Sequence, residues 1–97
     1  MASVTDIGQL ISRDPKIRGG RPCISGTGVS VRRIVGWHKM GLCPEEIAVK
    51  FGHLSLAQVH AALAYYHANY EEIEEDIRLE EEESQRLMKE FRSGEGQ

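Results

Sequence analysis

Seven basic side chains lie between Arg13 and Lys39, with Asp14 as the single acidic residue among them, and they form the densest group in this sequence that could do chemistry. Guanidinium and ammonium groups at this density make an array of positive charge that suits contacts with nucleic-acid phosphates. An ordinary solvated surface can carry the same pattern. We predict DNA contacts for five of them, Arg18, Arg21, Arg32, Arg33 and Lys39.

A second group of predicted DNA contacts consists of His53, Ser55 and Gln58. The amide of Gln58 has the donor and the acceptor that an adenine edge requires. The Ser55–Gln58 spacing also matches a capping box, in which that amide would bind the backbone at the start of its own helix. We therefore expect phosphate contacts to outweigh base contacts, and DNA binding to require a homodimer that presents two such helices.

Metal binding and catalysis are not expected. The cysteines and histidines include no Cys-x-x-Cys or His-x-x-x-His pair, which a structural zinc site usually needs, so we predict no metal and no cofactor. Cys43 precedes Pro44 at a helix start, where a thiolate would be favoured, but no residue can be assigned as its base. We interpret Cys43 as an unusual N-cap and the chain as a non-enzyme.

Charge divides the chain into two parts. Residues 1–69 hold eight Lys and Arg against four Asp and Glu, whereas residues 70–97 hold four against eleven. A basic part can attract a polyanion, and an acidic part can engage a basic protein surface. A run of acidic residues such as Glu80 to Glu83 is usually a solvated face, yet apolar residues lie before and after this run. We predict that five of them contact a partner protein: Ile73, Ile77, Leu87, Met88 and Phe91.

The elements that would position these residues are mainly helical. Turn residues between Leu10 and Ser25 predict a small β-hairpin. Helical spacing and end signals predict one helix from Ser30 to Gly41, a second from Pro44 to Gly52, and a third from Ser55 that continues without interruption into the acidic part. The predicted fold is a three-helix helix-turn-helix head, homeodomain-like, with a short N-terminal β-hairpin and a long C-terminal helix. Residues 1–70 would form the head and residues 71–97 an acidic extension with a frayed end.

The sequence also resembles a known family. The stretches DPKIRGGRPCISGTGVSV and GLCPEEIAVKFGHLSLAQVHAALAYY are similar to domain-of-unknown-function family 433, over roughly residues 10–75. The shared elements are Gly19, Gly20, Arg21, Pro22, Gly26, Thr27, Glu46, Ile47, Leu54 and Ala61 to Leu63. The chain departs from the family at Gly28 and Ser30, where relatives usually have Arg and Pro. The resemblance implies a VapB-type antitoxin with a helix-turn-helix head, encoded beside a PIN-like ribonuclease toxin.

We therefore expect an antitoxin-like regulator, whose head binds operator DNA as a dimer and whose C-terminal helix binds a PIN-like ribonuclease toxin. The alternative is a protein-interaction or oligomerisation module without DNA binding. Residues 51–70 lack Asp, Glu, Lys and Arg, but polar side chains interrupt them, so no membrane span is expected. The few cysteines and the absence of a signal-like leader favour a cytoplasmic location.

Overall fold

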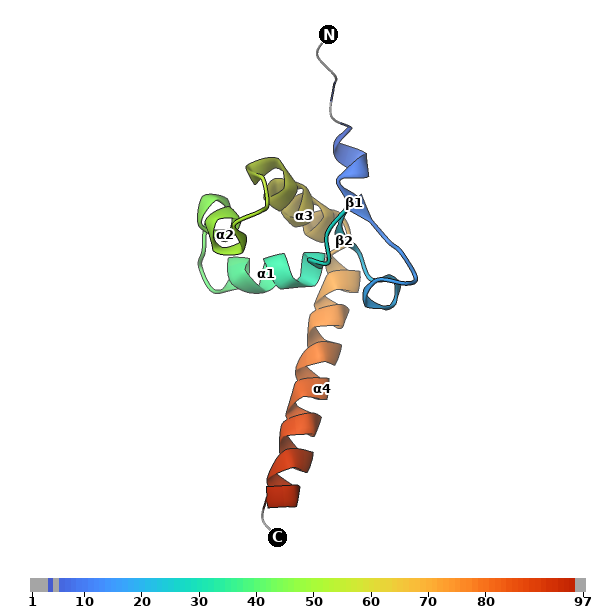
Figure 1. Cartoon of the computed structure of the whole chain (residues 1–97), viewed down its shortest axis with the longest axis vertical. Coiled ribbons are helices and arrows are strands. Elements are labelled where there is room, and N and C mark those ends of the chain that lie inside the picture. The colour runs from blue at the N-terminus through green and yellow to red at the C-terminus, as the bar shows by residue number, and fades with distance from the viewer. Residues whose placement is uncertain (1–3, 5, 96–97) are drawn as a thin grey trace.

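The chain folds into a small helical head from which one long helix projects (Figure 1). The structure is a computed structural model that describes Val4 and residues 6–95, with side chains as far as Phe91. Two short 3-10 turns, Ile7–Gln9 and Arg18–Gly20, accompany the main elements. These elements are β1 (Ile11–Ser12), β2 (Cys23–Ile24), α1 (Val31–Lys39), α2 (Pro44–Phe51), α3 (Leu56–Ala68) and α4 (Tyr70–Glu95).

The two strands form the predicted hairpin. They pair antiparallel, with Ile11 opposite Ile24 and Ser12 opposite Cys23. Both residues of β2 are buried, and Ile24 is completely buried against the helices. The hairpin therefore covers one side of the helical head.

The residues that the sequence indicates as helix ends bound α1 and α2 on three sides: Ser30 at the start of α1, Gly41 after it, and Gly52 after α2. Ser30 Oγ accepts a hydrogen bond from Arg33 N at 3.2 Å and caps α1. Gly41, which follows α1, has φ 97°, and Gly52, which ends α2, has φ 76°. Both values lie in the left-handed region that glycine adopts without strain, so each glycine allows the chain to turn into the next element.

The start of α3 is the predicted capping box. Ser55 Oγ accepts from Gln58 N at 3.1 Å, and Gln58 Oε1 accepts from Ser55 N at 2.7 Å. These two bonds satisfy backbone donors that have no partner within the helix. They also fix the short link between α2 and α3.

Ser55→Ala is expected to lower the free energy of unfolding by about 1 kcal/mol, because it removes the N-cap acceptor. Urea denaturation followed by circular dichroism measures this change. Ser84→Ala, at an exposed position inside α4, serves as the matched control and should leave stability unchanged or slightly higher. Equal losses in both variants would contradict the capping role of Ser55.

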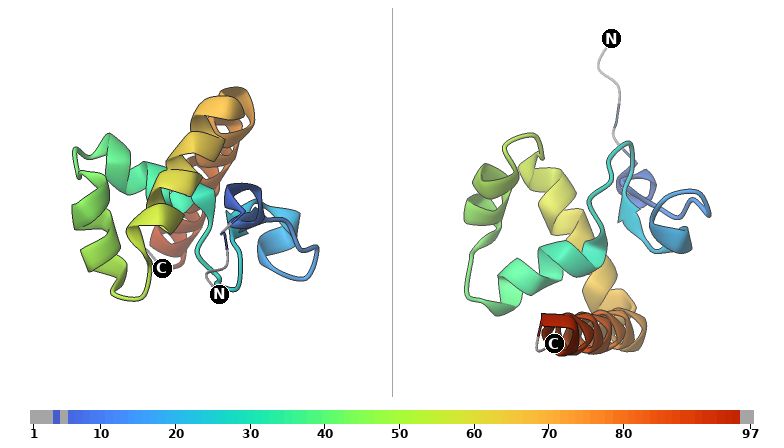
Figure 2. Two further views of the ribbon diagram at one scale, coloured as in Figure 1. Left: turned by 90° about the horizontal axis from the view of Figure 1, so that it is seen from above. Right: turned by 60° about the horizontal axis from the view of Figure 1, so that its bottom comes forward.

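The prediction of one uninterrupted helix from residue 56 onwards is wrong. The helix breaks at Asn69, whose backbone has φ −131° and ψ 45°, and α4 leaves in a new direction (Figure 2). Asn69 Nδ2 donates to Tyr65 O at 3.1 Å, and such side-chain bonds to the backbone compete with regular helix geometry. The break turns α4 onto α1, so that Ile73 enters the core.

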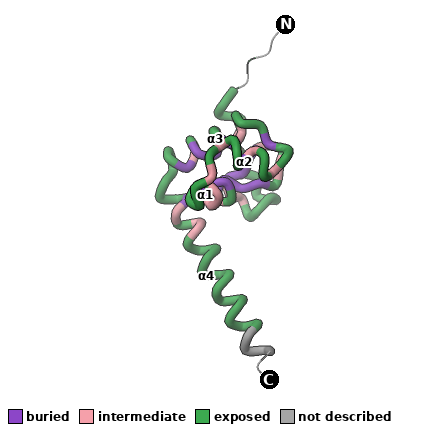
Figure 3. Tube along the Cα trace, turned by 90° about the vertical axis from the view of Figure 1, so that its left-hand side faces the viewer, coloured by how far each residue is buried: buried purple, intermediate pink, exposed green. Residues whose placement is uncertain are grey.

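The core lies inside the head and includes the first turn of α4 (Figure 3). Its completely buried large side chains come from β2 and all four helices: Ile24, Val31, Ile34, Val35, Ile47, Val59 and Ile73. The core thus extends past the boundary expected at residue 70. In the part of the chain that the structure describes, no helix has the length and apolar character that crossing a membrane requires.

Candidate interaction surface

Among the described residues, four ion pairs join basic side chains of the head to acidic side chains of α4. Arg21 Nε lies 2.9 Å from Asp76 Oδ1, and Lys39 Nζ lies 2.6 Å from Glu74 Oε2. The other two pairs are Arg13 with Glu72 and Arg32 with Glu80. Much of the positive charge of the head is therefore neutralised within the chain.

The spacing of acidic residues along α4 accounts for three of these pairs. Glu72, Asp76 and Glu80 are four residues apart, so their side chains form one stripe on a helix. Sequence reasoning missed the pairs because it assigned the basic and the acidic residues to two different partners. The i,i+4 repeat of carboxylates was the available signal, but it does not reveal which surface the stripe faces.

Glu74 of α4 contacts side chains of both α3 and α1. It accepts a hydrogen bond from Tyr66 Oη in α3 at 2.5 Å and pairs with Lys39 at the end of α1. The Lys39 ammonium, with a further contribution from Tyr66, lowers the pKa of the Glu74 carboxyl. Burial, together with the bond to Glu74, raises the pKa of the Tyr66 phenol. The contact therefore favours a neutral Tyr66 and a charged Glu74.

We call the four ion pairs between the head and α4 the charged seam, and Arg32 is its most enclosed cation. Its side chain is 15% exposed, and its Nε is buried without a hydrogen-bond partner in the described part of the chain. Burial, reinforced by the neighbouring Arg21, lowers the pKa of Arg32. Glu80 compensates by placing a carboxylate against this guanidinium. The two residues mark the point where α4 leaves the head.

Acidification is expected to loosen the contact between α4 and the head. The hydrogen bond from Arg13 holds the pKa of Glu72 below its ordinary value of 4.5, and that from Lys39 does the same for Glu74. A carboxylate with a depressed pKa stabilises the fold above its unfolded pKa and loses this contribution as the pH falls through its folded pKa. The melting temperature should therefore fall between about pH 5 and pH 3 in low salt.

Glu74→Gln is the variant that checks this expectation, and it should flatten the dependence of the melting temperature on pH. The effect at pH 7 should stay below about 1 kcal/mol, because partly exposed pairs are screened. Glu71→Gln is the matched control, since Glu71 is exposed and forms no ion pair with any described residue. A profile of Glu74→Gln that matches the unmodified chain would reject the assignment.

The basic residues predicted to contact DNA do not form one free surface. Arg18 Nε donates to Gly28 O at 3.1 Å, and the Arg33 guanidinium lies 5.2 Å from the centre of the Phe51 ring. Neither arginine forms an ion pair with a described residue. The other three are engaged by α4: Arg21, Arg32 and Lys39. DNA contact by this group remains a prediction, and it would require competition with α4.

The predicted contacts at the start of α3 bind their own backbone. Gln58 and Ser55 are occupied by the capping box, and His53 Nδ1 lies 2.9 Å from Phe51 O. The helix that would enter a DNA groove carries no Lys or Arg along its length. Any positive charge that contacts phosphates near α3 would therefore have to come from the neighbouring elements.

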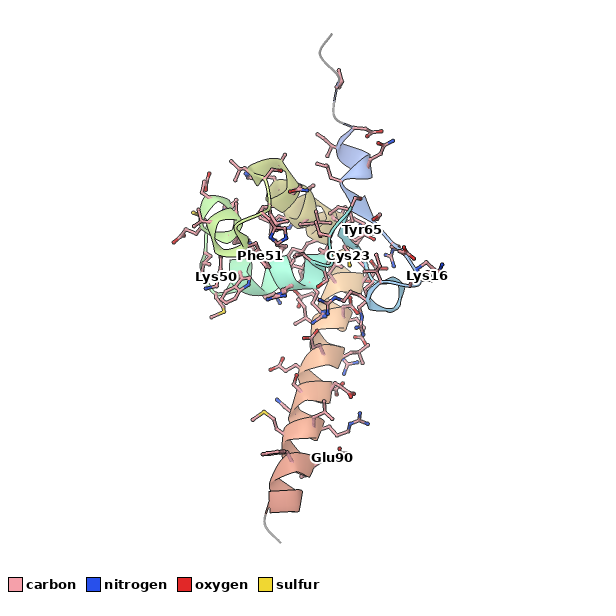
Figure 4. All side chains as sticks on the ribbon, viewed as in Figure 1. Lys16, Cys23, Lys50, Phe51, Tyr65 and Glu90 are labelled. Atoms are coloured by element: carbon pink, nitrogen blue, oxygen red, sulfur yellow. The ribbon has the colours of Figure 1, made fainter. Side chains whose placement is uncertain are left out.

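The distal part of α4 extends beyond the head, and Glu80 is the last described residue of α4 that pairs with a side chain of the head. We define the arm as residues 78–91, all of which are exposed (Figure 3). Leu87, Met88 and Phe91 form its apolar tip, with 53%, 57% and 67% of their surface exposed. The label of Glu90 in Figure 4 marks this end of α4. The tip is therefore not covered by any described residue, and its contact with a partner stays a prediction.

The partner contact predicted for Ile73 requires correction. Its side chain is 0% exposed and belongs to the core, because the break at Asn69 turns it inward. Ile77, also predicted as a partner contact, is half-buried and packs against the core. The first turns of α4 thus anchor the arm, and the free apolar surface begins further along the helix.

A groove lies between α1 and the base of the arm. It has a volume of about 870 Å³, with apolar lining from Trp37, Met40 and Ile77. Arg18 and Arg33 line it on the side of the head, whereas Glu80, Glu81 and Ser84 line it on the side of α4. Met40 is 71% exposed, so the groove offers an apolar surface with charges on both sides.

The described cysteine and histidine side chains do not form a metal-binding cluster. In the described ranges, no three His, Cys, Asp or Glu side chains lie close enough together to hold a metal ion. Cys43 is exposed and Cys23 is buried, and burial raises the pKa of the Cys23 thiol. The surface features that remain are the charged seam, the groove and the arm.

Comparisons with known proteins identify relatives of the head. The sequence model of a family described as "Protein of unknown function (DUF433)" matches residues 11–66. No curated protein matches the chain. The crystal structure of a DUF433 member protein from Anabaena variabilis is similar, with 27% sequence identity and a TM-score of 0.68. The match covers 72% of this chain and 69% of that one.

Proposed function

Because this chain belongs to the DUF433 family, whose function is unknown, we propose a function from its geometry: a protein-interaction module that captures a partner with its arm. The exposed apolar tip of the arm carries this proposal. Leu87, Met88 and Phe91 occupy neighbouring positions on a helix that no described element covers. An amphipathic helix of this kind suits a hydrophobic groove of a partner protein.

The partner class that fits best is a protein whose apolar groove has a basic rim. Of the four consecutive glutamates that precede the tip, residues 80–83, Glu81 forms no ion pair with a described residue and would face such a rim. The family resemblance suggests a PIN-like ribonuclease toxin as this partner, so the module would act as an antitoxin. The head would then serve as the rigid base that fixes the direction of the arm.

Co-purification with the product of the adjacent gene tests the proposal. Leu87→Glu combined with Phe91→Glu is expected to abolish capture, because two charges would enter an apolar groove. Circular dichroism should show that the head remains folded, since both residues lie outside the core. Leu79→Glu, on a different face of α4, is the matched control and should still capture the partner. Retention by the double variant would reject the proposed role of the tip.

Operator binding by a dimer of the head is the second candidate function. It is favoured by Arg18 and Arg33, which line the same groove and form no ion pair with a described residue. Duplex DNA carrying the region upstream of the gene is the probe, and fluorescence anisotropy at increasing salt is the measurement. Arg18→Ala with Arg33→Ala should weaken binding strongly. Binding that is absent, or insensitive to salt, would reject this function.

A further inference from the structure

We infer that the groove between α1 and the base of the arm binds single-stranded nucleic acid, with its phosphates on the side of α1 and its bases turned toward α4. The inference goes beyond both functions proposed above. It shares Arg18 and Arg33 with operator binding, but it requires a single strand instead of a duplex. It uses no side chain of the apolar tip, so it can fail while capture of a partner stands.

One face of α1 lines the groove over almost the whole length of the helix. Its lining residues recur three or four positions apart, which places their side chains on one side: Arg32, Arg33, Gly36, Trp37, Lys39 and Met40. From Arg32 to Met40 the chain rises by about 12 Å along the helix axis. This length exceeds one nucleotide, so the surface can follow linked nucleotides of an extended strand.

Gly36 is an open stretch of backbone at the middle of this face. Its conformation is helical, and a Cβ atom at this position would meet no described atom outside its own helical turn within 4 Å. Packing of the head therefore does not require glycine here, although glycine destabilises a helix relative to alanine. Glycine does allow a ligand to approach the backbone closely. Because Gly36 lines the groove, we interpret it as the place where the strand lies nearest to α1.

Trp37, next to Gly36, gives the groove an aromatic surface. The Trp37 ring is half-buried against the core, and the Lys50 ammonium lies 4.3 Å from its centre, so positive charge flanks this surface. Aromatic rings among cations suit single strands, because every base has a π-face and the attached phosphate is anionic. The bases of a duplex are stacked on one another and offer no such face. The part of the ring that lines the groove is therefore the expected contact of a base.

Two cations of the groove have no carboxylate partner in the described part of the chain. They are Arg18 and Arg33, whereas the other two cations of the lining are paired with α4. Arg18 Nε donates to Gly28 O at 3.1 Å, which holds this side chain at the groove. The terminal nitrogens of a guanidinium bind a phosphate through two parallel hydrogen bonds. The two arginines therefore mark the expected positions of the phosphates.

The α4 side of the groove supplies hydrogen-bond acceptors for the bases. Glu81 forms no ion pair with a described residue, and Ser84 lies three residues further along the same side of α4. A carboxylate repels phosphates, but it accepts hydrogen bonds from the amino groups of unpaired bases. Guanine provides two donors on one edge, its N1–H and its N2 amino group. The mixed charge of the groove therefore determines which side of the strand faces which helix, and it favours guanine.

Trp37 is the single tryptophan of the sequence, so its fluorescence reports directly on this groove. The experiment titrates the full chain with a short DNA single strand of alternating guanine and thymine. We expect quenching of Trp37 and a rise in the anisotropy of a label on the strand over the same concentrations. The duplex with the complementary strand should bind about tenfold more weakly or worse and leave the fluorescence unchanged, because it cannot stack a base on the ring.

Gly36→Ala separates binding from folding. The added methyl group should raise the melting temperature, because alanine favours a helix, and should weaken binding of the strand about tenfold, because it occupies the point of closest approach. Arg18→Ala with Arg33→Ala should also weaken binding and lower its dependence on salt. Val49→Ala, at an exposed position of α2, is the control and should bind the strand normally.

Glu81→Ala tests the orientation of the strand. The unmodified chain should bind the strand of guanine and thymine several-fold more tightly than the complementary strand of adenine and cytosine, and the variant should bind the two equally. If the phosphates lay against α4 instead, removal of this carboxylate would strengthen binding of both strands and leave the preference unchanged. That result would reject the orientation.

Four outcomes would overturn the inference: no binding of the single strand in low salt, equal binding of the duplex, full binding by Gly36→Ala, or equally tight binding of free guanosine monophosphate. Equal binding of the duplex would favour operator binding, and equal binding of the nucleotide would define a small-molecule pocket. Co-purification of the variant with Leu87→Glu and Phe91→Glu does not involve this groove. Its result therefore judges the proposed function separately.

Discussion

Ile73→Ala is expected to lower the free energy of unfolding by about 2 to 4 kcal/mol, because it removes a completely buried side chain and leaves a cavity. Ile73 is the residue of α4 that enters the core, where it joins side chains from α1 and α3. Urea denaturation measures the loss. Hydrogen exchange should also show faster opening of α4, since the variant loosens its anchor.

Leu79→Ala is the control for this variant, because Leu79 lies on the same helix and is 43% exposed. Its effect should stay within about 0.5 kcal/mol. A small loss in Ile73→Ala, similar to that of the control, would mean that α4 does not pack on the head. The expected division between head and arm would then also be wrong.

Ending the chain after Tyr70 is expected to remove most of its stability, on the order of 3 to 5 kcal/mol, which is a large share of the total for a domain of this size. This truncation deletes Ile73 and Ile77 and leaves Arg32, Lys39 and the other cations of the seam without their carboxylates. A chain that ends after Ser84 keeps all of these contacts. The chain that ends after Ser84 should melt close to the temperature of the full chain. The chain that ends after Tyr70 should show a broad melting transition or none.

These two truncations place the boundary of the head. Cooperative unfolding of residues 1–70 at unchanged temperature would show that the head is complete without α4, as the sequence-based boundary assumes. Loss of cooperativity in the chain that ends after Ser84 would show instead that the arm itself stabilises the head. The structure leads us to expect neither outcome.

Local features of the sequence predicted the elements of the head. The capping residues Ser30 and Ser55, the N1 proline Pro44 and the turn glycine Gly52 act within a few residues of themselves, so their effects do not depend on the rest of the fold.

Features that depend on distant parts of the chain were not predictable. The apolar spacing continues through Asn69, so nothing in the periodicity indicates that the helix breaks there and that Ile73 turns into the core. The pairing of Arg32 with Glu80 joins residues that lie far apart in the sequence. Opposite charges in two segments fit an internal contact as well as two separate partners, and only the folded arrangement distinguishes them.

The four ion pairs between the head and α4 have a consequence for any polyanion that the protein meets. The carboxylates of α4 act as tethered counterions, which remain attached to the chain when they are displaced. Nucleic acid binding is driven largely by small cations that leave the DNA phosphates when basic side chains replace them. Arg21, Arg32 and Lys39 can replace them only by leaving their own carboxylates. The affinity should therefore be lower than the number of basic residues suggests, because each displaced carboxylate stays close to the DNA and repels its phosphates.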